Sequence, residues 1–258
     1  MTSTLRADIY RLTHGIALYI TFAIMIVLAM SEILTDAITG VTVTSGNANP
    51  PSRSTQPLNG ATVAQALVAD VTQIVFFSIP LFVAVAMAIF SCGAVKNSLA
   101  MGMSRTKLYF SALALSFGLC LLLLIVRLGV GTLTATIVNG TGDWTGTLVR
   151  TIFQDLGQQV VLLLAFTSIG VFLSFAIRNT AAVTGIYIAF AMLPLIVLTI
   201  LSMSHPGLAK YLDYDLMTLV SSMGSTPGHA ARTLALGIGY IIVTTLAGLA
   251  IFRRIEIK

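Results

Sequence analysis

Long apolar runs separated by short polar segments repeat along the whole chain. A hydrocarbon core about 30 Å thick is crossed by a helix of about 20 residues. Six runs reach that length, and they cover residues 16–34, 71–90, 108–138, 151–177, 181–203 and 233–252. The third run is long for one crossing, so we expect it to tilt or to project beyond the bilayer. The pattern predicts an all-α polytopic membrane protein, with six transmembrane helices in a single transmembrane domain over residues 1–258.

The polar segments between the runs predict shorter elements. Residues 35–70 are rich in Thr, Asn, Ser, Gly and Pro, which favours a polar excursion, but their tail, "ATVAQALVAD", is typical of a helix that begins before the second run. Residues 204–232 indicate a short amphipathic or re-entrant helix at the membrane interface, because leucines stand there at helical spacing: Leu208, Leu212, Leu216 and Leu219. Pro80 and Pro194 lie inside the second and fifth runs, where each is expected to kink its helix.

Composition supports a membrane protein and narrows the chemistry. Of the 258 residues 57% are hydrophobic and 9% are charged, whereas a soluble domain carries roughly 25% charged residues. The cations are scattered without interleaved aromatic residues, which argues against nucleic-acid binding. The cysteines and histidines stand far apart, so we predict no disulfide framework and no metal site from them: Cys92, Cys120, His14, His205 and His229.

Lys and Arg residues divide unevenly between the two sides that six crossings create. One side receives nine of them, in short segments beside the runs: Arg6, Arg11, Lys96, Arg105, Lys107, Arg178, Arg253, Arg254 and Lys258. The other side receives four: Arg53, Arg150, Lys210 and Arg232. Because Lys and Arg are enriched in cytoplasmic segments, both termini are predicted to be cytoplasmic.

Sequence signatures of catalysis are absent. A phosphate-binding loop requires G-x-x-x-x-G-K-[ST], and in this sequence no lysine follows a glycine. Neither H-E-x-x-H nor G-x-S-x-G occurs. We therefore predict that the chain is not an enzyme and does not hold ATP phosphates itself.

The cytoplasmic stretch "SCGAVKNSLAMGMSRTKLY", residues 91–109, is richer in features than a plain connector. It carries three cations, two glycines and no acid, and small or apolar side chains follow one helical face: Ala94, Val95, Ser98, Leu99 and Met101. Such a helix along the membrane offers a ridge to a cytoplasmic partner. On composition alone, an ordinary interfacial loop with cytoplasmic cations explains the stretch better.

The same stretch resembles the coupling helix of ABC-2-type permeases, the membrane subunits of ABC transporters. That family often shows a "K-N-x-L-x-x-G-x-S-R-x-x-x-Y" run here, and the matching positions are Lys96, Asn97, Leu99, Gly102, Ser104, Arg105 and Tyr109. The N-terminal "ADIYRLTHGIALYI" looks like the family's interfacial elbow helix, which we place at residues 1–15, and "IFRRIEIK" resembles its basic-hydrophobic tail. The length of the chain is most similar to that of permeases in the small lantibiotic-immunity and bacitracin-resistance branch.

The resemblance implies the permease subunit of an exporter that moves peptides or amphipathic compounds out of the cell or membrane, as in antimicrobial peptide resistance. ATP and Mg²⁺ are then held by a separate ATPase subunit, present in two copies. A second permease chain, identical or homologous, completes the complex in a prokaryotic plasma membrane. The coupling helix loop spans residues 91–107, and its ATPase-coupling residues are Ala94, Lys96, Asn97, Leu99, Met101, Gly102, Ser104 and Arg105.

Ionisable and amide side chains near the ends of the runs form a second candidate site. Ionisable residues within membrane helices are functional candidates by default. We predict a polar cluster at the outer membrane face, with Gln154 and Gln159 beside its main members: Glu32, Arg127, Asp155 and Gln158. In it Arg127 pairs with Asp155 or Glu32 and acts as a gate or locks helices together. The alternative is that these residues simply snorkel to the lipid headgroups.

Two other functions stay open at this point. A small secondary transporter or channel without an ATPase predicts internal repeats and ion-coupling acids at mid-membrane, and the sequence shows no clear repeat. The third hypothesis is a membrane scaffold or sensor subunit that signals without transporting. A neighbouring ATPase gene favours transport, whereas a kinase gene without one favours sensing.

Overall fold

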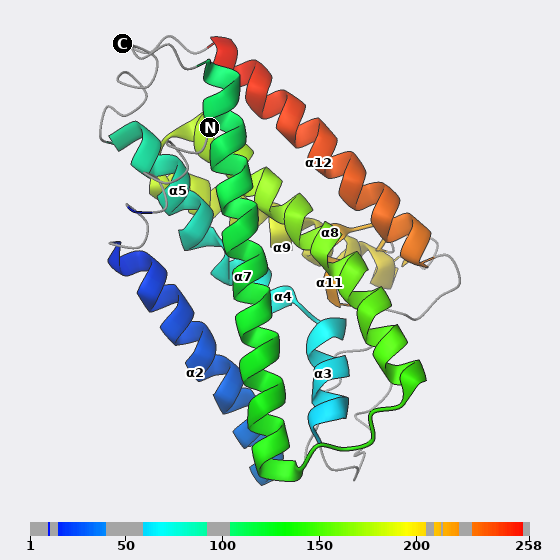
Figure 1. Ribbon diagram of the computed structural model, residues 1–258. Helices are drawn as coiled ribbons and strands as arrows, with labels where there is room; N and C mark the ends of the chain where they lie inside the picture. Colours follow the sequence, from blue (N-terminus) through cyan, green and yellow to red (C-terminus); the bar gives the residue numbers. More distant parts are fainter. Residues whose placement is uncertain are drawn as a thin grey trace.

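The computed structural model describes residues 10, 15–39, 59–91, 104–204, 209–212, 214–221 and 229–254. Every regular element in these ranges is a helix (Figure 1). In chain order they are α2 (Ile16–Thr39), α3 (Gly60–Ala69), α4 (Thr72–Phe77), α5 (Ile79–Ser91), α7 (Arg105–Asn139), α8 (Gly146–Ile177), α9 (Thr180–Ser204), α10 (Ala209–Leu212), α11 (Leu216–Ser221) and α12 (His229–Arg254).

The long helices confirm the membrane class. Within the described ranges α2, α7, α8, α9 and α12 are each long and apolar enough to cross a bilayer. The second predicted run differs from a single straight helix: α3 and the helix that follows it are bent by 59° at Asp70 and Val71. A second interruption at Ser78 separates α4 from α5, because the Pro80 ring lacks an N–H and clashes with the carbonyl one turn earlier. The described residues thus form a multi-pass helical membrane protein with five candidate spans, or up to six if the bent pair is one span.

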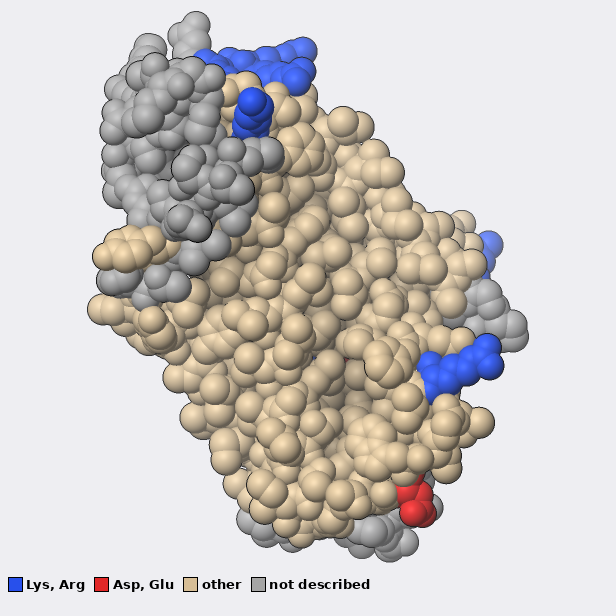
Figure 2. All heavy atoms as spheres, viewed as in Figure 1, with Lys and Arg blue, Asp and Glu red and all other residues tan. Residues whose placement is uncertain are grey.

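The bundle has two chemically different ends. Lys and Arg gather where α7 begins and where α8 and α12 finish, and we call this the cationic end: Arg105, Lys107, Arg178, Arg253 and Arg254. At the other end, which we call the hairpin end, residues 140–145 turn α7 into α8. Figure 2 shows cations at the end of α12 and a broad surface without charged residues below it.

Two helices are longer than a bilayer requires. α7 has 35 residues and α8 has 32, so they rise by about 52 Å and about 48 Å. Near the hairpin end α3 packs against both of them, and the Leu67 side chain of α3 lies on Gly131 of α7. The helix expected in "ATVAQALVAD" is therefore present, and it fills the space that the long pair leaves beside it (Figure 1).

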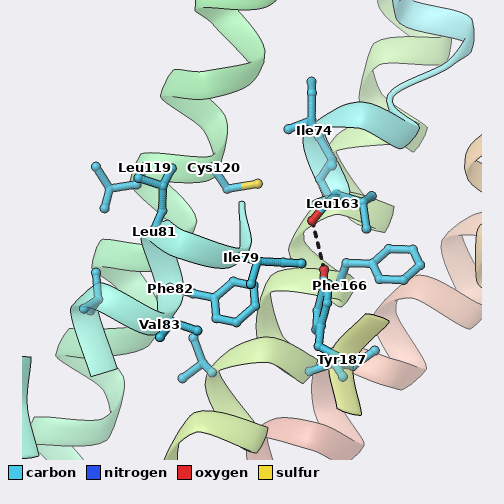
Figure 3. Packing of buried hydrophobic residues seen from close by; sticks show 14 of the residues in the cluster. Ile74, Ile79, Leu81, Phe82, Val83, Leu119, Cys120, Leu163, Phe166 and Tyr187 are labelled. Atoms are coloured by element: carbon cyan, nitrogen blue, oxygen red, sulfur yellow. Dashed lines mark hydrogen bonds between the residues drawn. The ribbon is translucent and has the colours of Figure 1, made fainter. Parts of the chain in front are cut away.

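The apolar core forms around α8. In an apolar stretch of 18 residues in that helix, 61% of the residues are buried. The corresponding share is 11% in α9 and in α12. Figure 3 shows Phe82 and Phe166 beside Tyr187, whose hydroxyl donates to the carbonyl of Val75 at 3.3 Å. Gly170 gives the Phe82 ring room to lie directly on α8. The core thus joins α5, α8 and α9, and it holds the interrupted second span in place.

Several sequence predictions lie outside the described residues or differ from what is seen. The elbow helix, apart from Tyr10 and Gly15, lies outside them, as do His14, His205 and Cys92. The segment after α9 contains two short helices, α10 and α11, instead of one. A carboxylate oxygen of Asp215 accepts from the Thr218 N–H at 3.1 Å, which starts α11 as a separate element.

Candidate functional site

Side chains of α7 and α8 satisfy the backbone at the break between α3 and α4. The last carbonyls of a helix have no partner within it, and in a membrane such groups must be satisfied by protein. Arg127 Nη1 donates to the carbonyl of Asp70 at 2.7 Å. Gln159 Nε2 donates to the carbonyls of Ala69 at 3.1 Å and of Val220 at 3.0 Å. The bend in the second span is therefore stabilised by two long-range side-chain contacts.

Arg127 also connects the break to α2. Its side chain is 5% exposed, and its Nη2 lies 3.7 Å from Glu32 Oε2. The other oxygen of Glu32 accepts from the amide of Gln73 on α4. We call Glu32, Asp70, Gln73, Arg127 and Gln159 the break network. It joins α2, α3, α4, α7 and α8, and Gln159 extends it to the end of α11.

The other end of α3 is fixed to the hairpin. Asn59 caps the helix by accepting from the Thr62 N–H at 3.0 Å. The N–H groups of Gly60 and Ala61 donate to the carbonyls of Gly140 at 3.0 Å and Thr141 at 3.2 Å. With its other end held by Arg127 and Gln159, α3 is clamped at both ends.

The break network overlaps the predicted polar cluster only in part. Arg127 pairs with Glu32, one of the two acids proposed for it, and it is buried instead of snorkelling. Asp155 lies half-buried on α8, outside the contacts that Arg127 makes. Gln158 donates to the Gln154 carbonyl of its own helix at 3.4 Å, and the neighbouring Gln159 makes the bridge instead.

Asp70 and Gln73 are members of the network that were not expected from the sequence. They stand in "ADVTQIVFF", where polar residues interrupt the start of the second apolar run. That interruption was the available signal, because a polar side chain at this depth requires a partner.

Replacing Gln159 by leucine is expected to lower the free energy of unfolding by about 1–3 kcal/mol, because two buried carbonyls lose their donor while the volume is nearly kept. The measurement is the thermal unfolding midpoint in detergent. Gln154→Leu, at an exposed position five residues earlier on α8, is the matched control and is expected to leave the midpoint unchanged. Equal midpoints for the two variants would contradict the bridging role of Gln159.

Aromatic rings from four helices meet at the cationic end. The Phe175 ring on α8 lies 5.2 Å from Phe90 of α5, 5.1 Å from Tyr109 of α7 and 5.0 Å from Phe252 of α12. These tilted and edge-on pairs are favourable arrangements for aromatic rings. The Arg178 guanidinium covers Phe90 at 5.2 Å from its centroid. We call Phe90, Tyr109, Phe175 and Phe252 the aromatic cluster.

Backbone contacts strengthen the same end. Arg105 Nη1 donates to the last carbonyls of α12, at 3.3 Å to Phe252 and 2.9 Å to Arg253. In return Arg253 Nη2 donates to Thr106 Oγ1 at 3.2 Å. Ser104 caps α7 by accepting from the Lys107 N–H at 3.4 Å. Of the two predicted ATPase-coupling residues that the structure describes, Arg105 thus fixes α7 to α12, whereas Ser104 caps α7.

The remaining predicted coupling residues lie outside the described residues: Ala94, Lys96, Asn97, Leu99, Met101 and Gly102. The helices on either side of them are nevertheless described. Segment 92–103 leaves α5 just after Phe90 and enters α7 just before Tyr109. Both residues belong to the aromatic cluster, so each end of the segment is connected to α8 and α12.

The break network and the aromatic cluster both connect helices to one another. Across the described ranges, no three His, Cys, Asp or Glu side chains come together in a group that could hold a metal ion. The sequence matches no protein-family model and no curated protein. The break network, the aromatic cluster and the segment between α5 and α7 are therefore the features that bear on function.

Proposed function

We propose that this protein is the membrane permease subunit of an ATP-binding-cassette exporter. It moves peptides or other amphipathic compounds, and a separate ATPase subunit hydrolyses the ATP. The observation that carries the proposal is that Phe90 and Tyr109, described residues on either side of segment 92–103, belong to one aromatic cluster. The sequence of that segment resembles a coupling helix. A force applied to this segment acts on Phe90 and Tyr109, and through them on α8 and α12.

α8 provides the connection to the other end of the molecule. Phe175 belongs to the aromatic cluster, and Gln159 lies 16 residues earlier, about 24 Å away along the helix. Movement of α8 therefore acts on the break between α3 and α4, where Gln159 donates to Ala69. In the proposed mechanism, ATP-driven closure of two ATPase subunits moves α8 and thereby rearranges the bent second span.

The distribution of charge supports the proposed orientation. The described acidic side chains Glu32, Asp70, Asp143, Asp155 and Asp215 lie away from the cationic end, which holds five Lys and Arg residues. Cytoplasmic segments are enriched in Lys and Arg. We place the cationic end and both termini in the cytoplasm of a prokaryotic plasma membrane, count the bent pair as one of six spans, and expect a second permease chain.

The test is a pull-down of tagged protein from detergent-solubilised membranes of its native host. An ATPase is expected to co-purify with the wild type and to be lost from a variant that carries Leu99→Asp and Met101→Asp, because two carboxylates destroy the apolar face of the segment. The matched control carries Gly146→Asp and Thr151→Asp at the exposed start of α8, and it is expected to retain the ATPase. Absence of an ATPase from the wild type would overturn the proposal.

A second candidate function is a small secondary transporter or channel, and the broken span α3–α4 is the observation that favours it. In such transporters, unwound backbone carbonyls of discontinuous helices coordinate the driving ion. Here Arg127 and Gln159 donate to the carbonyls of Asp70 and Ala69, so both already have partners. Uptake into proteoliposomes driven by an ion gradient, without an ATPase, would favour this candidate over the first.

A further inference from the structure

A pocket of about 260 Å³ lies between α8, α9, α12 and the described residues Tyr211 and Tyr214–Met217. Its wall is mostly aromatic and apolar, and its residues include Phe190, Pro194, Tyr211, Tyr214, Asp215 and Tyr240. Neither the break network nor the aromatic cluster contributes to it. An apolar pocket with a few convergent polar groups is the usual form of a ligand site.

Asp215 is the acidic group of this pocket. Its Oδ2 accepts from the N–H and the hydroxyl of Thr218, at 3.1 and 3.3 Å. Burial raises the pKa of this carboxyl, and hydrogen bonds from Thr218 and Met217 oppose that change. Among the described residues no Lys or Arg lies within 4.0 Å of the carboxylate. A carboxylate that is partly buried without a cation favours a ligand that brings one.

Two cations stand just outside the pocket. Lys210 Nζ lies 5.2 Å from the ring centroid of Tyr211, and Arg232 Cζ lies 4.8 Å from that of Tyr214. Neither Lys210 nor Arg232 lines the pocket, although both tyrosines do. The site therefore has negative charge on its wall and positive charge around it.

We propose that this pocket binds the headgroup of a zwitterionic amphiphile, with the ammonium group among the tyrosine rings beside Asp215 and the phosphate toward Lys210 and Arg232. Aromatic faces attract organic cations, most strongly where water is excluded. The carboxylate adds a direct ion pair, and the apolar wall suits the methyl and methylene groups around an ammonium nitrogen. The phosphate of the same headgroup matches the two outer cations. Binding requires no ATPase, so this proposal stands apart from the proposed function.

The test is calorimetric titration of the purified full chain in maltoside micelles with three soluble probes. Dihexanoylphosphatidylcholine carries both charges, dodecyltrimethylammonium carries the ammonium alone, and dihexanoylphosphatidic acid carries the phosphate alone. Asp215→Asn removes the charge but keeps a side chain that caps α11. It is expected to weaken binding of the first two probes about tenfold. Asp143→Asn, at an exposed acid of the hairpin, is the control and is expected to change nothing.

The probes also identify the source of the headgroup. Tighter binding of the phosphatidylcholine than of dodecyltrimethylammonium, with both weakened by Asp215→Asn, supports a phospholipid as the ligand. Equal binding of the two, again weakened by Asp215→Asn, would overturn the assignment of a zwitterionic headgroup, because the phosphate would add nothing, and would indicate a soluble amphiphilic cation instead. Wild-type affinity in Asp215→Asn, or phosphatidic acid bound as tightly as the phosphatidylcholine, would overturn the proposal.

Discussion

Arg127→Leu is expected to lower the free energy of unfolding by about 3 kcal/mol while the protein still inserts into the membrane. Loss of one partner from a buried ion pair costs about 3–5 kcal/mol, because the other charge stays buried without compensation. Here the variant leaves Glu32 without its cation and the carbonyl of Asp70 without its donor. Glu32 is only partly buried, at 36% exposed, and keeps the hydrogen bond from Gln73, so the expected cost lies at the lower limit.

The measurement is reversible unfolding in mixed detergent micelles, and transport is expected to fall along with stability because one end of α3 is then held by Gln159 alone. Arg150→Leu removes an exposed arginine from the start of α8 and is the matched control. The double variant with Glu32→Gln is expected to cost less than the sum of the single variants, since both remove the same pair. If Arg127→Leu matched Arg150→Leu in stability and transport, the break network would have no locking role.

Phe175→Ala is expected to be comparably destabilising and, in addition, to uncouple transport from ATP hydrolysis. Phe175 is fully buried and contacts the rings of Phe90, Tyr109 and Phe252. Truncation of a buried phenylalanine costs about 3–5 kcal/mol in soluble proteins. Helix packing in membranes depends mainly on van der Waals contact, so most of that contact energy is lost here as well. The lower part of the range is expected, because burial from water adds little within a bilayer.

Uncoupling is the more informative part of this prediction. The variant complex is expected to bind its ATPase and to hydrolyse ATP at the basal rate. Transport is expected to be lost, and so is the stimulation of ATP hydrolysis by substrate. Phe153→Ala removes the same ring from the same helix at a position 68% exposed, and it is expected to leave both properties intact. Stimulation that survives in Phe175→Ala would show that the force passes elsewhere.

The sequence located the long helices to within a few residues. The runs 108–138 and 181–203 correspond to α7 (Arg105–Asn139) and α9 (Thr180–Ser204). The bend at Asp70 and Val71 was not predicted, because no Gly or Pro marks it. It is stabilised by Arg127 and Gln159, which stand 57 and 90 residues further along the chain from the carbonyls they contact.

The sequence also does not reveal which of two neighbouring glutamines makes the contact to α3. Gln158 and Gln159 have the same chemistry and adjacent positions, so their composition does not distinguish them. Successive residues of a helix point about 100° apart. Only Gln159 reaches the end of α3, and the amide of Gln158 donates to its own helix. The packing of α3 against α8 decided between them.

The sequence by itself thus determined the membrane class, the long helices and the unequal division of Lys and Arg between the two ends. Each of these depends on how one segment interacts with lipid or water, and local composition fixes that interaction. The tertiary structure decided that Arg127 pairs with Glu32, that α3 is clamped, and that Asp215 lines an aromatic pocket. These features are contacts between segments distant in the chain, which exist only after the helices have packed together.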